Sequence, residues 1–535
     1  MSVKPPQRLE ITSEQMQALK GRIKNRRLDP SDYDVLLGVT ETVERLSRAL
    51  AEKNTAIGRL CKYLLGAPTE KAKNVLKDRE QDCNSAPEAN PDASQSPSEP
   101  SAKKPKPKGH GKKAACDYTG ANRICLQHPC LKVGDPCPGC DKGKLYELAM
   151  PSVFVHVTGS APLEATVYER ARLRCNLCGE LFVPELPAEV GKDKFDASAP
   201  AMLALLKYGC GMPFNRLEKL QDHLGQPLPA STQWDIVNAA ATALAPVWDA
   251  LVAEAAQGRI VHNDDTTAKV LEFLQRQDPD SKRKGIFTTG IVSDGGGHRI
   301  ALFMTGGRHA GENLTELLRR RRTGLSPPIQ MCDALNRNES KEFETILANC
   351  LAHARRQFVE LVDRFPDDCA YVIERLAEVY HNDGLCKKEN LSSQQRLAYH
   401  RQHSAPVMDA LHKWCQAQIQ EKRVEPNSGL GKAIGYMLKR WDKLTRFLQV
   451  PDAPLDNNLC ERALKYAILH RKNALFYKTQ RGAYVGDLFM SLIHTCQLAG
   501  VNPLDYIGWL LKTEPKTLQA SPERFMPWLY QQPAS

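Results

Sequence analysis

The chain has 535 residues, of which 42% are hydrophobic and 25% charged, and its formal net charge is +11. This composition is typical of an ordinary globular protein with room for three or four folding units. The seventeen cysteines are scattered through a long chain, which excludes a small disulfide-stapled scaffold and predicts mostly reduced thiols.

The most apolar run, residues 239 to 256, is interrupted by Pro246, Asp249 and Glu254, and the first ten residues contain no apolar signal region. We therefore expect a cytoplasmic protein without a membrane partner.

The N-terminal part, residues 1 to 80, is predicted to be a helical arm. Apolar residues recur every seven positions at Leu36, Val43, Leu50, Ile57 and Leu64. Such a heptad favours a coiled coil and a homo-oligomer, although a single amphipathic helix packed on its own domain has the same pattern.

Residues 81 to 115 form a predicted disordered linker that is rich in lysine and proline. Residues 84 to 115 contain six prolines and no Leu, Ile, Val or aromatic residue, and six lysines lie in residues 102 to 113. The basic run is either a solvated linker or a segment that binds phosphates. The basic clusters at 282 to 284 and 319 to 322 have the same two interpretations.

Residues 116 to 190 are predicted to form a zinc ribbon. Two Cys-x-x-Cys pairs, Cys137 with Cys140 and Cys175 with Cys178, are joined by strand-like segments. Four thiolates at this spacing are typical of one structural Zn²⁺, because they leave no open coordination position for catalysis.

Residues 191 to 257 change to a helical pattern, with glycine and proline between three predicted helices and Ser231 as a candidate N-cap. The region is interpreted either as a helix-turn-helix-like DNA-binding unit or as an ordinary helical connector.

Residues 258 to 360 are predicted to be a mixed α/β region. Residues 259 to 273, 285 to 293 and 298 to 306 are predicted strands, followed by a helix around 312 to 322 and a fourth strand near 327 to 335. Ribonuclease-H-like nucleotidyl transferases share this order, and their carboxylates gather at one end of the sheet. Strand alternation alone does not choose between Asp264 and Asp265, which point to opposite faces.

The chain resembles the DDE transposases of the insertion sequence 66 family over nearly its full length. The segments that carry this resemblance are "VHNDDTTAKVL", "IQMCDA", "CLAHARRQF" and "DNNLCERALKYAILHRKNALF". The resemblance implies that Asp264, Asp333 and Glu461 are the catalytic acids and hold two Mg²⁺ or Mn²⁺ ions. Two such ions activate the attacking oxygen and stabilise the leaving oxygen in phosphoryl transfer.

Residues 361 to 452 are predicted to be a helical insertion, because much of this interval has the pattern of amphipathic helices. A Glu-bearing helix at 453 to 495 and a C-terminal segment at 496 to 535 follow. Asp456 is the expected N-cap of that helix. The candidate DNA-binding residues are Arg308, His353, Arg355, Arg356, Asn457, Asn458, Arg462, Arg471 and Lys472.

The resemblance implies transposition of a bacterial mobile element, with action at the nucleoid. The implied partners are double-stranded DNA, as terminal inverted repeats and as target DNA, and accessory proteins encoded by the same element. The fold is expected to be multidomain α+β/α with a ribonuclease-H-like catalytic domain. Two other classes are a non-catalytic DNA-binding regulator and a metal-dependent nuclease of the same fold, and joining of DNA ends distinguishes the transposase from both.

Overall fold

The computed structural model describes residues 159 to 174, 181 to 190, 193 to 275 and 285 to 531, with short stretches nearer the N-terminus. The heptad beyond Leu36, the linker at 81 to 115 and the four ribbon cysteines lie outside the described residues. The chain divides into two compact units, one built mainly on residues 354 to 390 and 401 to 438 and the other on residues 87 to 353, 391 to 400 and from 439 onward.

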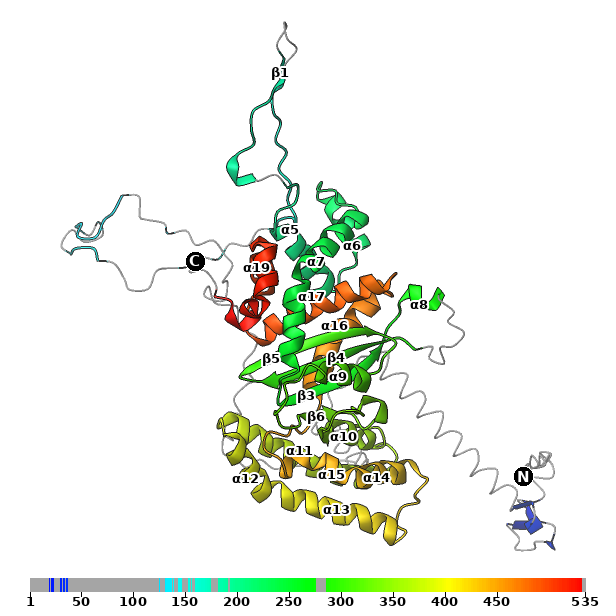
Figure 1. The fold of residues 1–535 in the computed structure, drawn as a ribbon. Coiled ribbons are helices and arrows are strands. Elements are labelled where there is room, and N and C mark those ends of the chain that lie inside the picture. The colour runs from blue at the N-terminus through cyan, green and yellow to red at the C-terminus, as the bar shows by residue number, and fades with distance from the viewer. Residues whose placement is uncertain are drawn as a thin grey trace, which may run out of the picture. The chain divides into compact units, whose positions relative to one another are not determined.

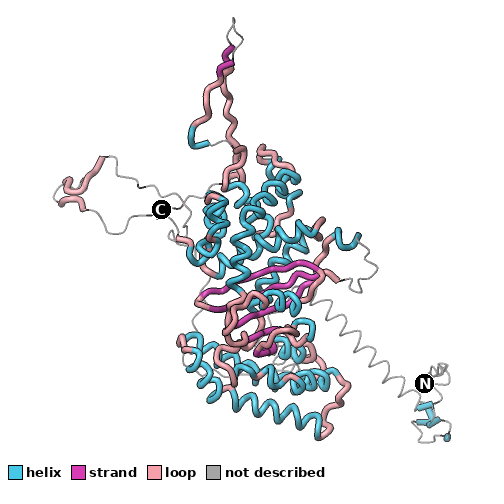
Figure 2. Tube along the Cα trace, in the orientation of Figure 1, coloured by secondary structure: helices cyan, strands magenta, loops and turns pink. Residues whose placement is uncertain are grey.

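A five-stranded sheet forms the centre of the larger unit (Figure 2). Its strands lie in the order β5-β4-β3-β6-β7. Their bounds are Ile260–Thr267 for β3, Phe287–Gly295 for β4, His298–Gly306 for β5, Ile329–Cys332 for β6 and Ile346–Asn349 for β7.

The chain order of three strands, a helix and a further strand agrees with the prediction. β3 and β4 are antiparallel, as are β4 and β5, whereas β6 runs parallel to β3 and β7 parallel to β6. The tight turn between β4 and β5 uses Gly296 and Gly297, both at positive φ, which matches the right-handed twist of a hairpin.

Two details of the sheet differ from the sequence prediction. β3 ends at Thr267 rather than near 273, because the chain then leaves β4, forms a bridge between Val270 and Tyr477 and enters α8 (Leu271–Gln275). The fifth strand, β7, was not predicted, since four residues carry too little periodicity to be recognised.

Helices cover the sheet and supply most of the core (Figure 1). α7 (Ala230–Ala255) packs on β4 and β5, α16 (Asn458–Ala474) on β3 and β4, and α9 (Ala310–Leu318) on β3 and β4. The other elements are η2 (Ala188–Val190), α5 (Ser198–Ala204), the π-helical turn η3 (Leu205–Gly209), α6 (Phe214–His223), α8 (Leu271–Gln275), η4 (Asn336–Asn338), α15 (Trp441–Leu444), η5 (Arg446–Leu448), α18 (Pro503–Lys512), α19 (Pro515–Ala520), η6 (Pro522–Phe525) and η7 (Pro527–Leu529).

The third helix of the predicted helix-turn-helix region, α7, is therefore part of the core of this unit. Among the described residues it is also the one helix long and apolar enough to cross a membrane by length and composition. Leu244, Val247 and Leu251 on this helix are fully buried. A DNA-binding role for residues 191 to 257 stays a prediction.

α17 (Gln480–Leu498) covers the free edge of β5. Asp487, Ser491 and Thr495 are spaced four residues apart on α17, and they accept hydrogen bonds from the backbone N–H groups of Thr305, Phe303 and Ala301 at 2.7, 3.0 and 3.1 Å. Four helical residues advance by about 6 Å and two strand residues by about 7 Å, so the two spacings match. The edge strand is thereby closed to pairing with another chain.

The smaller unit is helical. It is built on α11 (Pro366–Lys388) and α13 (Ala405–Gln420), which pack together, and on α14 (Gly429–Lys439). α10 (Leu351–Val359) and α12 (Ser393–His403) each contain residues of both units. Helices thus occupy the interval where a helical insertion was predicted.

Short paired segments flank both Cys-x-x-Cys motifs. Pro136 forms an antiparallel bridge with Lys144, and β1 (Leu173–Arg174) pairs antiparallel with β2 (Leu181–Phe182). Each motif therefore connects two paired chain segments.

Candidate active site

Glu461 lies in the first turn of α16, and a glycine on the sheet allows this helix to approach closely. Gly290 of β4 is the direct partner of Asp264 on β3. A Cβ atom at Gly290 would lie 2.9 Å from Leu464 and 3.4 Å from the Sγ atom of Cys460, two residues on the buried face of α16. The Sγ atom of Cys460 also donates a hydrogen bond to the Gly290 carbonyl at 3.2 Å. The missing side chain therefore lets α16 sit directly on the sheet beside Asp264.

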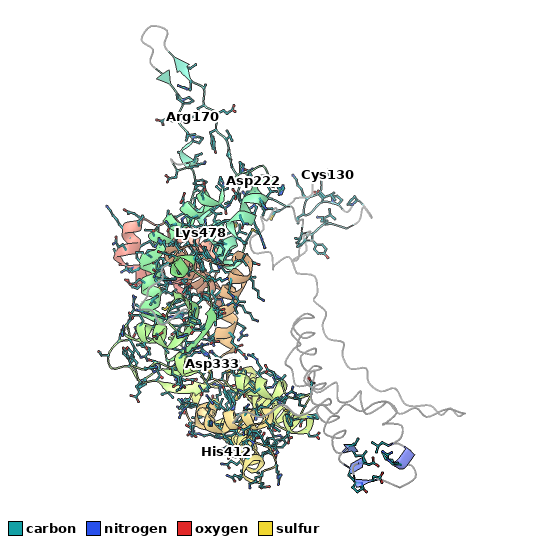
Figure 3. The ribbon with its side chains drawn as sticks, turned by 90° about the vertical axis from the view of Figure 1, so that its right-hand side faces the viewer. Cys130, Arg170, Asp222, Asp333, His412 and Lys478 are labelled. Atoms are coloured by element: carbon teal, nitrogen blue, oxygen red, sulfur yellow. The ribbon has the colours of Figure 1, made fainter. Side chains whose placement is uncertain are left out.

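Asp264 and Asp333 are brought together by a shared hydrogen-bond donor. Asp333 follows β6 directly and is labelled in Figure 3. The Nδ2 atom of Asn338 donates to Asp333 Oδ1 at 2.5 Å and to Asp264 Oδ1 at 3.3 Å. Asn338 is itself fully buried, and its carbonyl oxygen accepts from Asn263 at 2.8 Å and from Gln330 at 2.7 Å. A buried amide network thus fixes the donor between the two carboxylates.

Asp265 points to the opposite face and has a different environment. Its carboxylate accepts hydrogen bonds from Thr289 Oγ1 at 2.7 Å and from the Ala310 N–H at 3.0 Å, with His309 Nδ1 at 3.2 Å. It therefore lies at the N-terminus of α9, where the helix dipole favours a negative charge. The structure brings Asp264, and not Asp265, to Asp333.

The carboxylates concentrate negative charge. Burial, together with the charges of Asp333, Asp265 and Glu461, raises the pKa of Asp264 to about 7. Within the described residues, no lysine or arginine forms an ion pair with Asp264 or Asp333. Hard oxygen donors without a neighbouring cation fit a divalent ion such as Mg²⁺.

Asn457 anchors the start of α16 and does not face solvent. It is fully buried, its Oδ1 accepts from His262 Nδ1 at 3.1 Å and its Nδ2 donates to the Asn263 carbonyl at 3.1 Å. Burial lowers the pKa of His262 to about 4, so this imidazole is neutral and its Nδ1 carries the proton. The expected N-cap at Asp456 is wrong by one residue, because Asn457 occupies that position and α16 begins at Asn458. Asp456 instead accepts from the Asn458 N–H at 3.1 Å.

The other candidates on α16 have different exposures. Asn458, Arg462 and Lys472 are exposed, so their side chains are accessible to DNA. Arg471 is half-buried and donates to Thr266 and Thr267 at the end of β3, which gives it a structural contact.

Arg308 lies beside a cavity of about 340 Å³ at the start of α9. It is exposed and pairs with Glu316 on the same helix at 3.4 Å. The cavity is lined by acidic and basic residues in equal number, Arg308, Arg319, Arg337, Lys341, Glu312, Glu316, Glu339 and Glu342. Such a balanced lining gives no net attraction for phosphate.

The basic cluster at 319 to 322 makes contacts within the protein. Arg319 pairs with Glu316 and Glu342, Arg320 with Asp249, and Arg321 donates to the carbonyls of residues 256 and 258.

His353 is the candidate that lies nearest to a carboxylate. Its Nδ1 atom is 3.6 Å from Glu461 Oε1, and the two side chains are about a quarter exposed. Arg355 and Arg356 follow on α10, and Arg355 is buried.

Asn338 and Gly290 were not among the predicted site residues. Asn338 lies in "DALNRN", where a short amide side chain five residues after an acid is an ordinary loop feature. Gly290, in "FTTGIVS", could have been noticed as a glycine inside an apolar strand, which often marks the close approach of another backbone.

The mixed α/β domain thus brings carboxylates from a strand and a strand end together beside the helix that carries Glu461. The sequence model described as "Transposase IS66 family" matches residues 192–485. The chain belongs to this family, which supports a role in transposition.

Related proteins come from Sinorhizobium fredii (strain NBRC 101917 / NGR234). The uncharacterized protein y4hP is 27% identical over 368 residues, covering 64% of this chain and 64% of y4hP. The uncharacterized protein y4jD is 31% identical over 200 residues, covering 36% of this chain and 38% of y4jD. The chain thus spans less than two thirds of the length of these relatives.

Proposed function

We propose that the chain is a DDE transposase that cleaves the 3′ ends of its element and transfers the released 3′-hydroxyl into target DNA. The observation that carries the proposal is the hydrogen-bonded pairing of Asp264 and Asp333 through Asn338, with Glu461 close enough to raise the pKa of Asp264. The strand order β5-β4-β3-β6-β7 supports a ribonuclease-H-like catalytic domain for this chemistry.

Asp264, Asp333 and Glu461 would hold two Mg²⁺ or Mn²⁺ ions, which supply activation of the attacking oxygen and stabilisation of the leaving oxygen. Asn338 keeps the two aspartates at a fixed separation, and α16 holds Glu461 over the same end of the sheet. The same carboxylates can then serve both end cleavage and strand transfer. Water is the nucleophile in cleavage and the 3′-hydroxyl is the nucleophile in strand transfer, and both attack by the same in-line displacement.

DNA would be held mainly through its phosphates. The exposed side chains of Asn458, Arg462 and Lys472 lie on the helix that carries Glu461, so they are the best-supported contacts. Arg308, His353, Arg355 and Arg356 remain further candidates in the proposal.

The N-terminal regions would supply specificity and assembly. Cys137, Cys140, Cys175 and Cys178 would bind one structural Zn²⁺, and the paired segments on each side of both motifs support two metal-binding turns. The heptad at 36 to 64 would form a homo-oligomeric coiled coil that brings two DNA ends together. The protein would act at the bacterial nucleoid, together with accessory proteins encoded by the same element.

The test uses purified full-length protein, DNA that carries the element's terminal inverted repeats, target DNA and Mg²⁺ or Mn²⁺. We expect Glu461→Gln to reduce cleavage and joining by on the order of a hundredfold or more. Glu523→Gln, at an exposed glutamate of η6 away from the carboxylates, is the matched control and should retain activity. Cleavage without joining would favour a nuclease, and equal activity of wild type and Glu461→Gln would refute the assignment.

A further inference from the structure

A cysteine, a histidine and a glutamate meet where α10 and α16 begin. One ligand atom from each of Cys350, His353 and Glu461 lies within 4.8 Å of the other two. This cluster adjoins the carboxylate site because Glu461 belongs to both.

The backbone fixes the two residues on the α10 side. The Cys350 N–H donates to the Cys332 carbonyl at 3.1 Å, and the Cys350 Sγ atom accepts from the Asn457 N–H at 3.2 Å. His353 follows three residues later, in the first turn of α10, so both side chains are directed to one side of the helix. The anchor that fixes the start of α16, Asn457, therefore also fixes the sulfur.

The chemistry of these donors differs from that of the carboxylate site. A thiolate, an imidazole and a carboxylate are the ligands that Zn²⁺ and other borderline transition metals prefer, whereas Mg²⁺ prefers oxygen alone. Tetrahedral zinc has ligand distances of about 2.0 to 2.3 Å, so the three atoms need only a modest contraction to share one ion.

The burial of the cluster is also suited to a metal. Cys350 is fully buried, whereas the side chains of His353 and Glu461 are 25% and 27% exposed. The two facing atoms, His353 Nδ1 and Glu461 Oε1, are themselves shielded from solvent, so an ion held between them would be largely enclosed.

We infer that Cys350, His353 and Glu461 form a binding site for Zn²⁺ or a similar transition metal, and that this ion competes with the proposed magnesium site for Glu461. On binding, the Cys350 thiol releases its proton to solvent, and a ring nitrogen of His353 and a carboxylate oxygen of Glu461 complete the set of three donors. Zinc at this position would hold Glu461 away from Asp264 and Asp333 and inhibit the reaction. The inhibition rests on the proposed function, whereas the metal binding does not.

The binding test is equilibrium dialysis of the full-length protein against Zn²⁺, followed by metal analysis. We expect Cys350→Ser and His353→Gln each to bind one zinc fewer per chain than wild type, while zinc held elsewhere is unchanged. Cys415→Ser is the matched control, because Cys415 is also a fully buried cysteine but lies in α13. His353→Gln removes a partly exposed side chain, so this variant keeps the test valid if Cys350→Ser fails to fold.

The inhibition test uses magnesium-dependent cleavage of element ends. Zinc should inhibit the wild type, added Mg²⁺ should relieve the inhibition, and Cys350→Ser should need about tenfold more zinc for half-inhibition. Equal zinc stoichiometry in wild type, Cys350→Ser and His353→Gln would overturn the site. If no protein cleaves DNA, the proposed function fails while the dialysis result still decides the metal site.

Discussion

The Nδ2 atom of Asn338 lies 2.5 Å from Asp333 Oδ1 and 3.3 Å from Asp264 Oδ1, so a single amide group joins two carboxylates that come from different strands. The Asn338 carbonyl is held independently, by Asn263 and Gln330. The side chain can therefore be removed while the backbone of this loop keeps its hydrogen bonds.

Asn338→Ala should weaken metal binding and DNA cleavage by roughly 10- to 100-fold, the usual cost of losing a group that orients metal ligands. The affinity for Mn²⁺ and the rate of end cleavage check this expectation. Asn336→Ala, at an exposed asparagine two residues earlier, is the control and should behave like wild type. Unchanged Mn²⁺ affinity in Asn338→Ala would show that the amide does not position the carboxylates.

Gly290→Ala should displace α16, because the new Cβ atom would lie 2.9 Å from Leu464. Overpacking of this kind costs about 1 to 3 kcal/mol. We expect a lower free energy of unfolding and a larger loss of cleavage, since Glu461 moves with the helix. Denaturant unfolding and the cleavage assay measure the two effects.

The double variant Gly290→Ala with Leu464→Ala should recover part of the lost activity, because it restores space beneath α16. Gly306→Ala is the control, as a Cβ atom at Gly306 meets no atom within 4 Å. Failure of Leu464→Ala to restore any activity would contradict a steric cause.

Asp487 should make stability depend on pH. Burial raises the pKa of Asp487 from its ordinary value near 4 to about 7, although Thr305 donates two hydrogen bonds to its carboxylate. The native state therefore binds a proton that the unfolded state has released, and this contribution falls as pH rises from about 4 to 7. Asp487→Asn should remove the dependence, by an amount on the order of 4 kcal/mol at most.

Denaturant unfolding of wild type and Asp487→Asn at pH 5 and pH 8 tests this sign. His262 and His470 have lowered pKa values and act in the opposite direction, but both are present in the two proteins and cancel in the comparison. A difference in stability between the proteins that is the same at both pH values would refute the prediction.

A comparison of Lys472→Ala with Asn457→Ala should distinguish a residue that contacts DNA from one that stabilises the fold. Lys472 is exposed, so its removal should weaken DNA binding and reduce the salt dependence by about one phosphate contact, with unchanged stability. Asn457 is buried with both amide atoms bonded, so its removal should lower the melting temperature by several degrees. Binding measured at several salt concentrations and thermal unfolding distinguish the two outcomes, and a stable Asn457→Ala variant with weak DNA binding would reverse the assignment.

The sequence by itself determined the family and the order of the main elements. The strands at 285 to 293 and 298 to 306, with glycines between them, are local patterns, because alternation and turn chemistry depend on neighbouring residues. The motifs around Asp264, Asp333 and Glu461 were also recognised without any structure, since they lie in contiguous segments.

Only the tertiary structure decided which side chains meet. Neighbouring strand residues point to opposite faces, so the pairing of β3 with β4 and β6 was needed to direct Asp264 to Asp333 and Asp265 to α9. Asn338, Gly290 and the edge contacts of α17 act between segments far apart in the chain. Their importance follows from packing and hydrogen bonding across those segments, which no local sequence pattern contains.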